Sequence, residues 1–105
     1  MAEVMEALSG RADVRVWRNN VGAAKDGKRF VRFGLPGSAD ITGILADGRR
    51  LEIEVKGPKG KLSERQRYFG EMIRAFGGVY IVVRSAAELI QKLNEEKERS
   101  GLERS

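Results

Sequence analysis

With 105 residues, the chain has room for one domain of ordinary size and one modest hydrophobic core. It contains no cysteine and no histidine, which excludes disulfides, thiolate metal sites and imidazole chemistry, so that any bound metal must be a hard cation held by oxygen. Its 20 lysines and arginines exceed its 15 aspartates and glutamates, and the net charge of +5 favours a polyanionic partner such as nucleic acid.

The first third of the chain predicts a helix, a strand and a polar loop. Residues 2–10 are amphipathic at helical spacing and end in glycine, which predicts a short helix. The alternating residues 13–17 predict a strand. The polar, glycine-punctuated residues 18–29 predict a loop, and residues 30–34 predict a short strand beyond it.

Residues 39–45 and 49–56 predict two antiparallel strands joined by a turn around Gly48. A two-residue loop would mix polar and apolar side chains on both faces of this pair. A three-residue loop with a left-handed Gly48 instead sets Ile41 opposite Ile53, which gives one consistently apolar face. The sequence therefore predicts the three-residue loop.

Ser63 and Gln66 form a capping box that predicts the start of an amphipathic helix over residues 64–76. The apolar positions of this helix follow helical spacing: Phe69, Met72, Ile73 and Phe76. Residues 79–84 are almost continuously apolar, which predicts a strand covered on both faces.

Ser85 and Glu88 predict the cap of a last helix, and the charged residues 95–105 predict a frayed tail behind a single domain of residues 1–94. The elements follow the order α-β-β-β-α-β-α. This order predicts an α/β domain with a mixed β-sheet and flanking helices.

The predicted register also places two carboxylates together on the polar face. Asp40 lies opposite Glu54, with β-carbons about 5 Å apart, where like charges are destabilising. A divalent cation would convert the repulsion into coordination, because Mg²⁺ is commonly bound by one or two carboxylates. Lys56 shares the face and could orient or deprotonate a water or stabilise charge on a phosphate oxygen. Glu52 is expected to face solvent, and the alternative for all alternating Glu and Lys residues here is a solvated strand face.

Four sequence motifs follow one another along the chain: "GLPGSADI", "EIEVK", "GKLSERQ" and "GGVYIVVRS". They resemble the PD-(D/E)XK nuclease superfamily and, within it, the VRR-NUC (virus-type replication-repair nuclease) domain, over most of the chain. The resemblance implies a restriction-endonuclease-like fold and hydrolysis of DNA phosphodiester bonds with Mg²⁺ or Mn²⁺.

The resemblance also implies roles for particular residues. They are Asp40 and Glu54 as catalytic metal ligands, the carbonyl of Val55 as a further metal ligand, Lys56 as the catalytic lysine and Gln66 as a supporting site residue. Gln66 is explained equally by the capping box, and both roles are possible through different rotamers. The family's first-helix glutamate corresponds to Glu3 or Glu6, and we favour Glu3 as the additional metal ligand.

Polar and basic side chains near this site are candidates for sequence-independent contacts with DNA phosphates. They are Lys59, Lys61, Arg18, Asn19, Asn20, Lys28 and Arg29. For each of them the alternative is an ordinary solvated basic surface. Trp17 could stack on a base, but a lone tryptophan beside a strand is more often packed, so it is not among the predicted site residues.

The leading hypothesis is a metal-dependent endonuclease for structured or branched DNA, of the Holliday-junction or flap type. The alternative is a non-catalytic DNA-binding module that retains the nuclease fold, but such a module has no reason to keep the repelling pair of Asp40 and Glu54. The resemblance implies a homodimer with two sites on one DNA. No apolar run spans a bilayer and no leader is apparent, so we expect no membrane partner and a cytoplasmic protein of a bacterium or phage-infected host.

Overall fold

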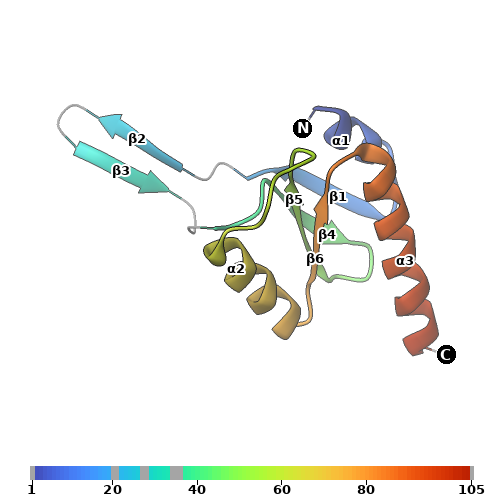
Figure 1. Cartoon of the computed structure of the whole chain (residues 1–105). Helices are drawn as coiled ribbons and strands as arrows, with labels where there is room; N and C mark the ends of the chain where they lie inside the picture. Colours follow the sequence, from blue (N-terminus) through green and yellow to red (C-terminus); the bar gives the residue numbers. More distant parts are fainter. Residues whose placement is uncertain (1, 20–21, 27–28, 34–36, 105) are drawn as a thin grey trace.

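The chain folds as a four-stranded mixed sheet between helices, with a two-stranded hairpin extending from it (Figure 1). The computed structural model describes residues 2–19, 22–26, 29–33 and 37–104. The elements in these residues are α1 Ala2–Leu8, β1 Val14–Arg18, β2 Gly22–Asp26, β3 Arg29–Phe33, β4 Ile41–Leu45, β5 Arg50–Val55, α2 Glu64–Ala75, β6 Val79–Val83 and α3 Ala86–Arg104.

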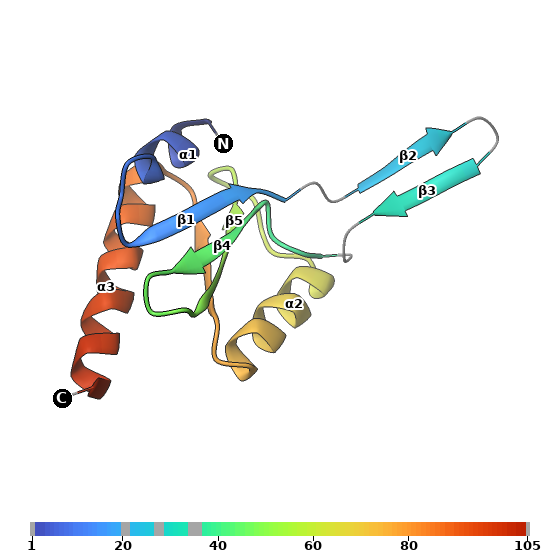
Figure 2. The same cartoon turned by 180° about the vertical axis from the view of Figure 1, so that it is seen from behind.

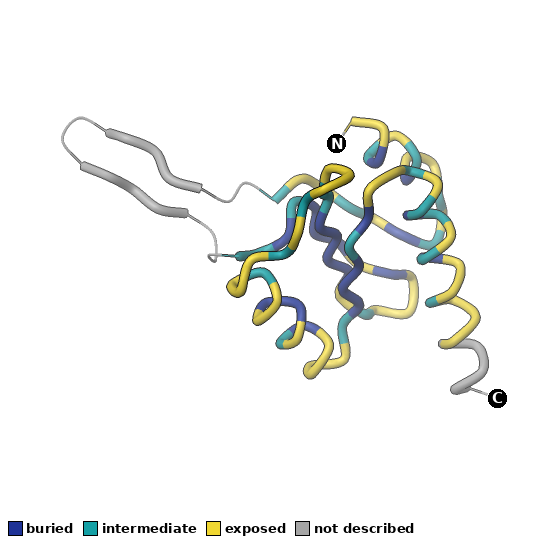
Figure 3. Tube along the Cα trace, viewed as in Figure 1, coloured by how far each residue is buried: buried dark blue, intermediate teal, exposed yellow. Residues whose placement is uncertain are grey.

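The sheet has the strand order β1-β4-β5-β6, in which β5 and β6 are parallel and the other neighbours are antiparallel. Without the hairpin of β2 and β3, the elements run α-β-β-β-α-β-α. The predicted fold class is therefore confirmed. Figure 3 shows that the central strands are largely buried, as expected for strands that have helices on both sides.

Two apolar clusters fill the spaces between the sheet and its helices. One lies under α1 and α3 and contains Val4, Leu8, Val14, Ile41, Leu45, Leu51, Ile53, Val79, Ile81, Val83, Leu89 and Leu93. The other lies under α2 and contains Ala39, Phe69, Ile73 and Tyr80. Odd-numbered side chains of β4 and β5 therefore point toward α1 and α3, and even-numbered ones toward the α2 side.

The hairpin of β2 and β3 corrects the prediction of a loop over residues 18–29. The two strands pair antiparallel from Gly22 opposite Phe33 to Asp26 opposite Arg29, and they extend away from the sheet (Figures 1 and 2). The predicted short strand after the loop is confirmed as β3. The loop prediction failed because β2 is defined by backbone pairing with β3, and the segment "GAAKD" has no apolar alternation that would reveal a strand.

The last helix extends to Arg104, through most of the segment that was expected to be a frayed tail. Charged side chains connect this extension to the rest of the fold. Lys97 Nζ lies 3.1 Å from Asp13 Oδ2, and Glu96 Oε2 lies 3.7 Å from Arg49 Nη1. Two of the charges that indicated a tail, those of Glu96 and Lys97, thus pair with the turns at one end of the sheet. In the described part of the chain, no helix combines the length and apolar character needed to cross a membrane.

Helix α2 begins and ends close to the predicted residues. Ser63 caps it, and Gly77, with a φ of 87°, follows its end. Of its predicted apolar positions, Phe69 and Ile73 are buried, whereas Phe76 is 85% exposed. Phe76 is the C-cap residue, so its side chain lies beyond the last turn that packs on the sheet.

Gly70 allows α2 to approach the sheet closely. A β-carbon at this position would lie 2.6 Å from ring atoms of Tyr80. The Tyr80 ring has little freedom to move, because it packs edge-to-face against Phe69, with ring centroids 6.0 Å apart, and the Arg74 guanidinium lies 5.3 Å from its centroid.

We predict that Gly70→Ala destabilises the protein by about 1 kcal/mol or more in urea unfolding. Because the overlap is with ring atoms at 2.6 Å, we expect the upper part of the overpacking range of about 1–3 kcal/mol, and the gain of about 1 kcal/mol from replacing glycine by alanine in a helix then leaves a net loss of about 1–2 kcal/mol. Gly57→Ala is the matched control, because no heavy atom lies within 4 Å of the added β-carbon. A Gly70→Ala variant as stable as the Gly57→Ala control would contradict the close packing.

Candidate active site

The register between β4 and β5 determines which side chains meet on the α2 side of the sheet. Ile41 pairs with Ile53 and Thr42 with Glu52, as the three-residue loop requires. Gly48 has a φ of 92°, and the Leu45 N–H donates to the Arg49 carbonyl at 2.9 Å across the turn. The predicted register and loop are confirmed.

Asp40 lies immediately before β4 and is held against β5. Its Oδ2 accepts a hydrogen bond of 2.8 Å from the Val55 N–H. The backbone of Asp40 is held by Asn19, whose N–H donates to the Asp40 carbonyl at 2.9 Å. The side-chain amide of Asn19 also donates to Ser38 Oγ and to the Ala39 carbonyl. Asn19, which was predicted as a phosphate contact, thus anchors the segment that carries Asp40.

Glu54 is a carboxyl group that the fold holds out of water, with 3% exposure. Burial and, after it, the nearby Asp40 carboxyl group raise the pKa of Glu54 to about 7, while Lys56 acts in the opposite direction. Within the described residues, Glu54 Oε2 is buried and has no hydrogen-bond partner. A buried carboxylate oxygen without a partner is costly, and it is also available to a cation.

Gln66 makes the capping contact and also contacts the carboxyl group of Glu54. Its Oε1 accepts a 2.8 Å hydrogen bond from the Ser63 N–H, which completes the capping box. Its Nε2 donates to Glu54 Oε1 at 3.0 Å. One side-chain conformation therefore links the start of α2 to the carboxyl group, and the expectation of two different rotamers was unnecessary.

Lys56 lies next to Glu54 and is mostly shielded from solvent. Its Nζ is 3.9 Å from Glu54 Oε1. Its backbone N–H donates to the Val83 carbonyl at 2.9 Å, and Arg84 Nη2 donates to the Gly60 carbonyl at 2.6 Å, so β6 and the residue after it hold the loop beyond Lys56.

Glu52 corrects the prediction of a solvent-facing residue, because it is fully buried. Thr42 Oγ1 donates to Glu52 Oε1 at 2.6 Å, and Arg50 Nε donates to the same oxygen. The physical reason is that β6 extends the sheet beyond β5 and α2 packs over both strands. Within the described residues, Glu52 Oε2 is buried and lacks a partner.

Tyr80 is a residue of this cluster that the sequence did not reveal. It pairs with Glu52 in the parallel register, and its pKa is raised to about 12, first by burial and next by the charge of Glu54, with Arg74 opposing the shift. Its hydroxyl is buried and has no partner among the described residues. Only knowledge that β6 lies beside β5 would have placed it here.

The first helix is not joined to the carboxylate pair. Glu3 and Glu6 are exposed on α1, which packs on the side of the sheet opposite α2. Among the described residues, no three His, Cys, Asp or Glu side chains come together as a metal-binding group. The predicted participation of Glu3 therefore has no contact in this structure to support it.

The predicted DNA-contacting residues are distributed over several parts of the chain. Lys59 and Lys61 are exposed on the loop after Lys56, and no ion pair involves them within the described residues. Arg18 pairs with Ile41. Its side chain therefore points to the side of the sheet that faces α1 and α3, opposite Asp40 and Glu54. The remaining three predictions fall in the hairpin region: Asn20 and Lys28 lie outside the described residues, and only the backbone of Arg29 is described.

Comparison with known proteins identifies a family model that matches this chain. The family model of the VRR-NUC domain matches residues 2–87, which include Asp40, Glu54, Lys56 and Gln66. A search of the curated proteins found no match.

We predict that the buried Glu54 makes stability depend on pH in metal-free buffer. Its pKa is about 7 in the folded protein against an ordinary value of 4.5 for an exposed glutamate, so the folded state binds more protons than the unfolded state between these values. The contribution of Glu54 to stability is then fully present below pH 4.5 and is lost as the pH rises through 7, by up to about 3 kcal/mol at about 1.4 kcal/mol per pKa unit. Glu54→Gln should remove this fall and be the more stable form at pH 8.

Urea unfolding of both proteins at pH 4.5, 6 and 8 measures the difference. Glu6→Gln, which alters an exposed glutamate of α1, is the control and should keep the wild-type dependence. Parallel pH profiles for wild type and Glu54→Gln would show that Glu54 carries no such proton.

Proposed function

The chain belongs to the VRR-NUC family of nuclease domains, and from this we propose a divalent-metal-dependent endonuclease that cuts structured or branched DNA, of the Holliday-junction or flap type. Nuclease-type processing of DNA follows from the family itself. The metal requirement and the kind of DNA are the proposal.

The observation that carries the metal requirement is the arrangement of Asp40 and Glu54. The two carboxyl groups are close enough for the charge of Asp40 to raise the pKa of Glu54, and Glu54 Oε2 is buried without a partner in the described residues. Oxygen ligands of this kind suit Mg²⁺ or Mn²⁺, and a cation would replace the proton that Glu54 otherwise holds near neutral pH. These residues fit the metal.

In this proposal Asp40, Glu54 and the Val55 carbonyl hold the metal, with Glu3 retained as a weaker candidate. When bound, the ion supplies Lewis-acid polarisation of the scissile phosphate and lowers the pKa of a water. The chain's own groups orient the site: the Val55 N–H fixes Asp40, and Gln66 Nε2 fixes Glu54.

We assign the chemical role of a cationic donor to Lys56. Its ammonium group is largely shielded and lies beside Glu54, where it can donate to a phosphate oxygen as negative charge develops or orient the attacking water. Lys59 and Lys61 extend from the following loop and are assigned to phosphate binding. A homodimer that presents two such sites to one branched DNA remains part of the proposal.

We predict that Mn²⁺ raises the melting temperature of the wild-type protein, because the ion binds only the folded carboxylate pair. At a concentration 100-fold above Kd the stabilisation is about 2.7 kcal/mol, which is several degrees for a domain of this size. Asp40→Asn should be slightly more stable than wild type without metal, since it removes the repulsion, and should lose the response to Mn²⁺. Glu98→Gln, in an exposed position of α3, is the control; an equal shift in all three proteins would place the ion elsewhere.

We predict that Lys56→Ala lowers single-turnover cleavage about 100-fold or more, while DNA affinity falls only modestly, because the lysine acts mainly in the transition state. The double variant Lys59→Ala and Lys61→Ala should do the opposite. It should weaken binding and reduce the slope of log K against log salt by about 0.9 per lost phosphate contact, with cleavage at saturation retained.

Labelled junction, flap and duplex DNA, each with Mg²⁺ or Mn²⁺, provide the substrates for both measurements. Normal cleavage by saturated Lys56→Ala would make Lys56 a phosphate anchor. Binding without cleavage of any substrate by the wild-type protein would favour the non-catalytic DNA-binding module.

A further inference from the structure

Part of the sheet surface beside the site carries large side chains that no helix covers. On the side of α2, Trp17 is 55% exposed and Ile44 is 45% exposed, although both lie within strands. Helix α2 packs on β5 and β6, at the other end of the strand order from β1. Trp17 and Ile44 line the same depression, and an exposed apolar patch with polar groups around it is typical of a binding surface.

The strand registers gather four side chains on this surface, which we name the Trp17 face. Trp17 pairs with Thr42, Arg15 with Ile44, and Ile44 with Arg50. Paired residues share a side of the sheet, and the hydrogen bond from Thr42 to Glu52 identifies that side as the one facing α2. The Trp17 face therefore consists of Arg15, Trp17, Ile44 and Arg50.

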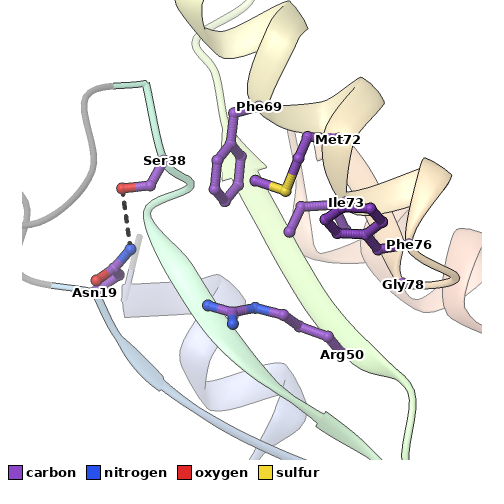
Figure 4. A pocket seen from close by; sticks show the side chains of 8 residues that line it. All are labelled: Asn19, Ser38, Arg50, Phe69, Met72, Ile73, Phe76 and Gly78. Carbon is purple, nitrogen blue, oxygen red and sulfur yellow. Dashed lines mark hydrogen bonds between the residues drawn. The ribbon is translucent and has the colours of Figure 1, made fainter.

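The Trp17 face is hollowed and continues toward α2. A shallow depression of about 490 Å³ has Trp17, Ile44 and Arg50 in its lining, and a second pocket of about 330 Å³ lies beside α2. Asn19 and Arg50 line both. In Figure 4 the Arg50 guanidinium extends across the second pocket on the side where Asn19 and Ser38 lie.

The Trp17 face carries two guanidinium groups, of which that of Arg50 is paired with the buried Glu52. Arg15 Nη1 donates to the carbonyls of Arg11 and Val14, and no carboxylate of the described residues forms an ion pair with it. Arg50 uses Nε for Glu52, while its side chain stays 63% exposed with its terminal amino groups on the pocket side. An indole surface flanked by guanidinium groups is the combination that binds single-stranded nucleic acid, through base stacking and phosphate contacts.

We infer that the Trp17 face binds an unpaired DNA strand, with one base stacked on the Trp17 indole, so that the preferred substrate has unpaired nucleotides next to the cleaved phosphate. This inference rests on the proposed function. Trp17 lies opposite Thr42, two residues or about 7 Å along β4 from Asp40, so one strand can reach both. A continuous duplex hides its base faces in the stack and cannot use this contact.

A second copy of the chain fits the Trp17 face less well than a DNA strand does. A symmetric contact would bring Arg15 and Arg50 against the same residues of the other copy, with like charges opposed. Two exposed apolar side chains also provide far less than the roughly 800 Å² per partner of a stable interface. A polyanion meets the charge and needs only the one aromatic surface.

Trp17 is the only tryptophan in the chain, so its fluorescence reports on this face directly. In EDTA, where no cleavage occurs, we expect a thymine oligonucleotide to quench the fluorescence saturably and a blunt duplex of the same length to quench it much less. Trp17→Leu should bind the labelled oligonucleotide about 10-fold more weakly, whereas Trp17→Phe should stay close to wild type. Tyr68→Leu, which removes an exposed aromatic ring of α2 outside the Trp17 face, is the matched control.

Unchanged fluorescence on saturation, or wild-type affinity in Trp17→Leu, overturns the inference. If sedimentation shows self-association that Trp17→Leu abolishes without changing DNA binding, the face is an interface between copies and the inference is again overturned. All binding is measured without metal, so the two proposals can fail separately. If DNA quenches the fluorescence but the protein cleaves no substrate, the proposed nuclease function is rejected and DNA binding on the Trp17 face is retained. If the protein cleaves DNA but shows no quenching, the nuclease function is retained and binding on the Trp17 face is rejected.

Discussion

The pairing of β4 with β5 in a single register is the constraint on which the site depends. Because side chains alternate along a strand, a shift of one residue would move Glu54 to the side of α1 and α3, away from Asp40. The left-handed Gly48 in the connecting turn fixes the register locally, and the apolar pair Ile41 and Ile53 fixes it from the core. The turn and the core therefore specify the same arrangement.

That register concentrates acidic and phenolic groups under α2. Three buried oxygens lack hydrogen-bond partners in the described residues: Glu52 Oε2, Glu54 Oε2 and the Tyr80 hydroxyl. Each is costly to bury, and a fold selected for stability alone would replace them with apolar groups. The larger apolar cluster, whose burial stabilises the fold, lies on the other side of the sheet, under α1 and α3.

How much of the structure the sequence could predict depended on whether the signal was local. The capping box at Ser63 and the turn at Gly48 were predictable, because each motif is complete within a few residues. The burial of Glu52 was not predictable. It results from the parallel pairing of β5 with β6, a strand more than twenty residues away, and the sequence does not show which strand lies beside β6. Trp17 was assigned to the packed interior for the same reason, since its exposure depends on where α2 lies.

The first strand links the two parts of the surface that the proposals use. Trp17 is the last residue but one of β1. Asn19 follows the end of this strand and forms three hydrogen bonds, to Ser38, Ala39 and the Asp40 backbone. Trp17, which we propose to meet an unpaired base, and Asn19, whose amide groups anchor the Asp40 segment, are thus two residues apart in the sequence at the end of β1. A displacement of the end of β1 by a bound DNA strand would act on Asp40 directly through Asn19, without passing through the core. The same short segment therefore connects the Trp17 face to the backbone of Asp40 through the hydrogen bonds of Asn19.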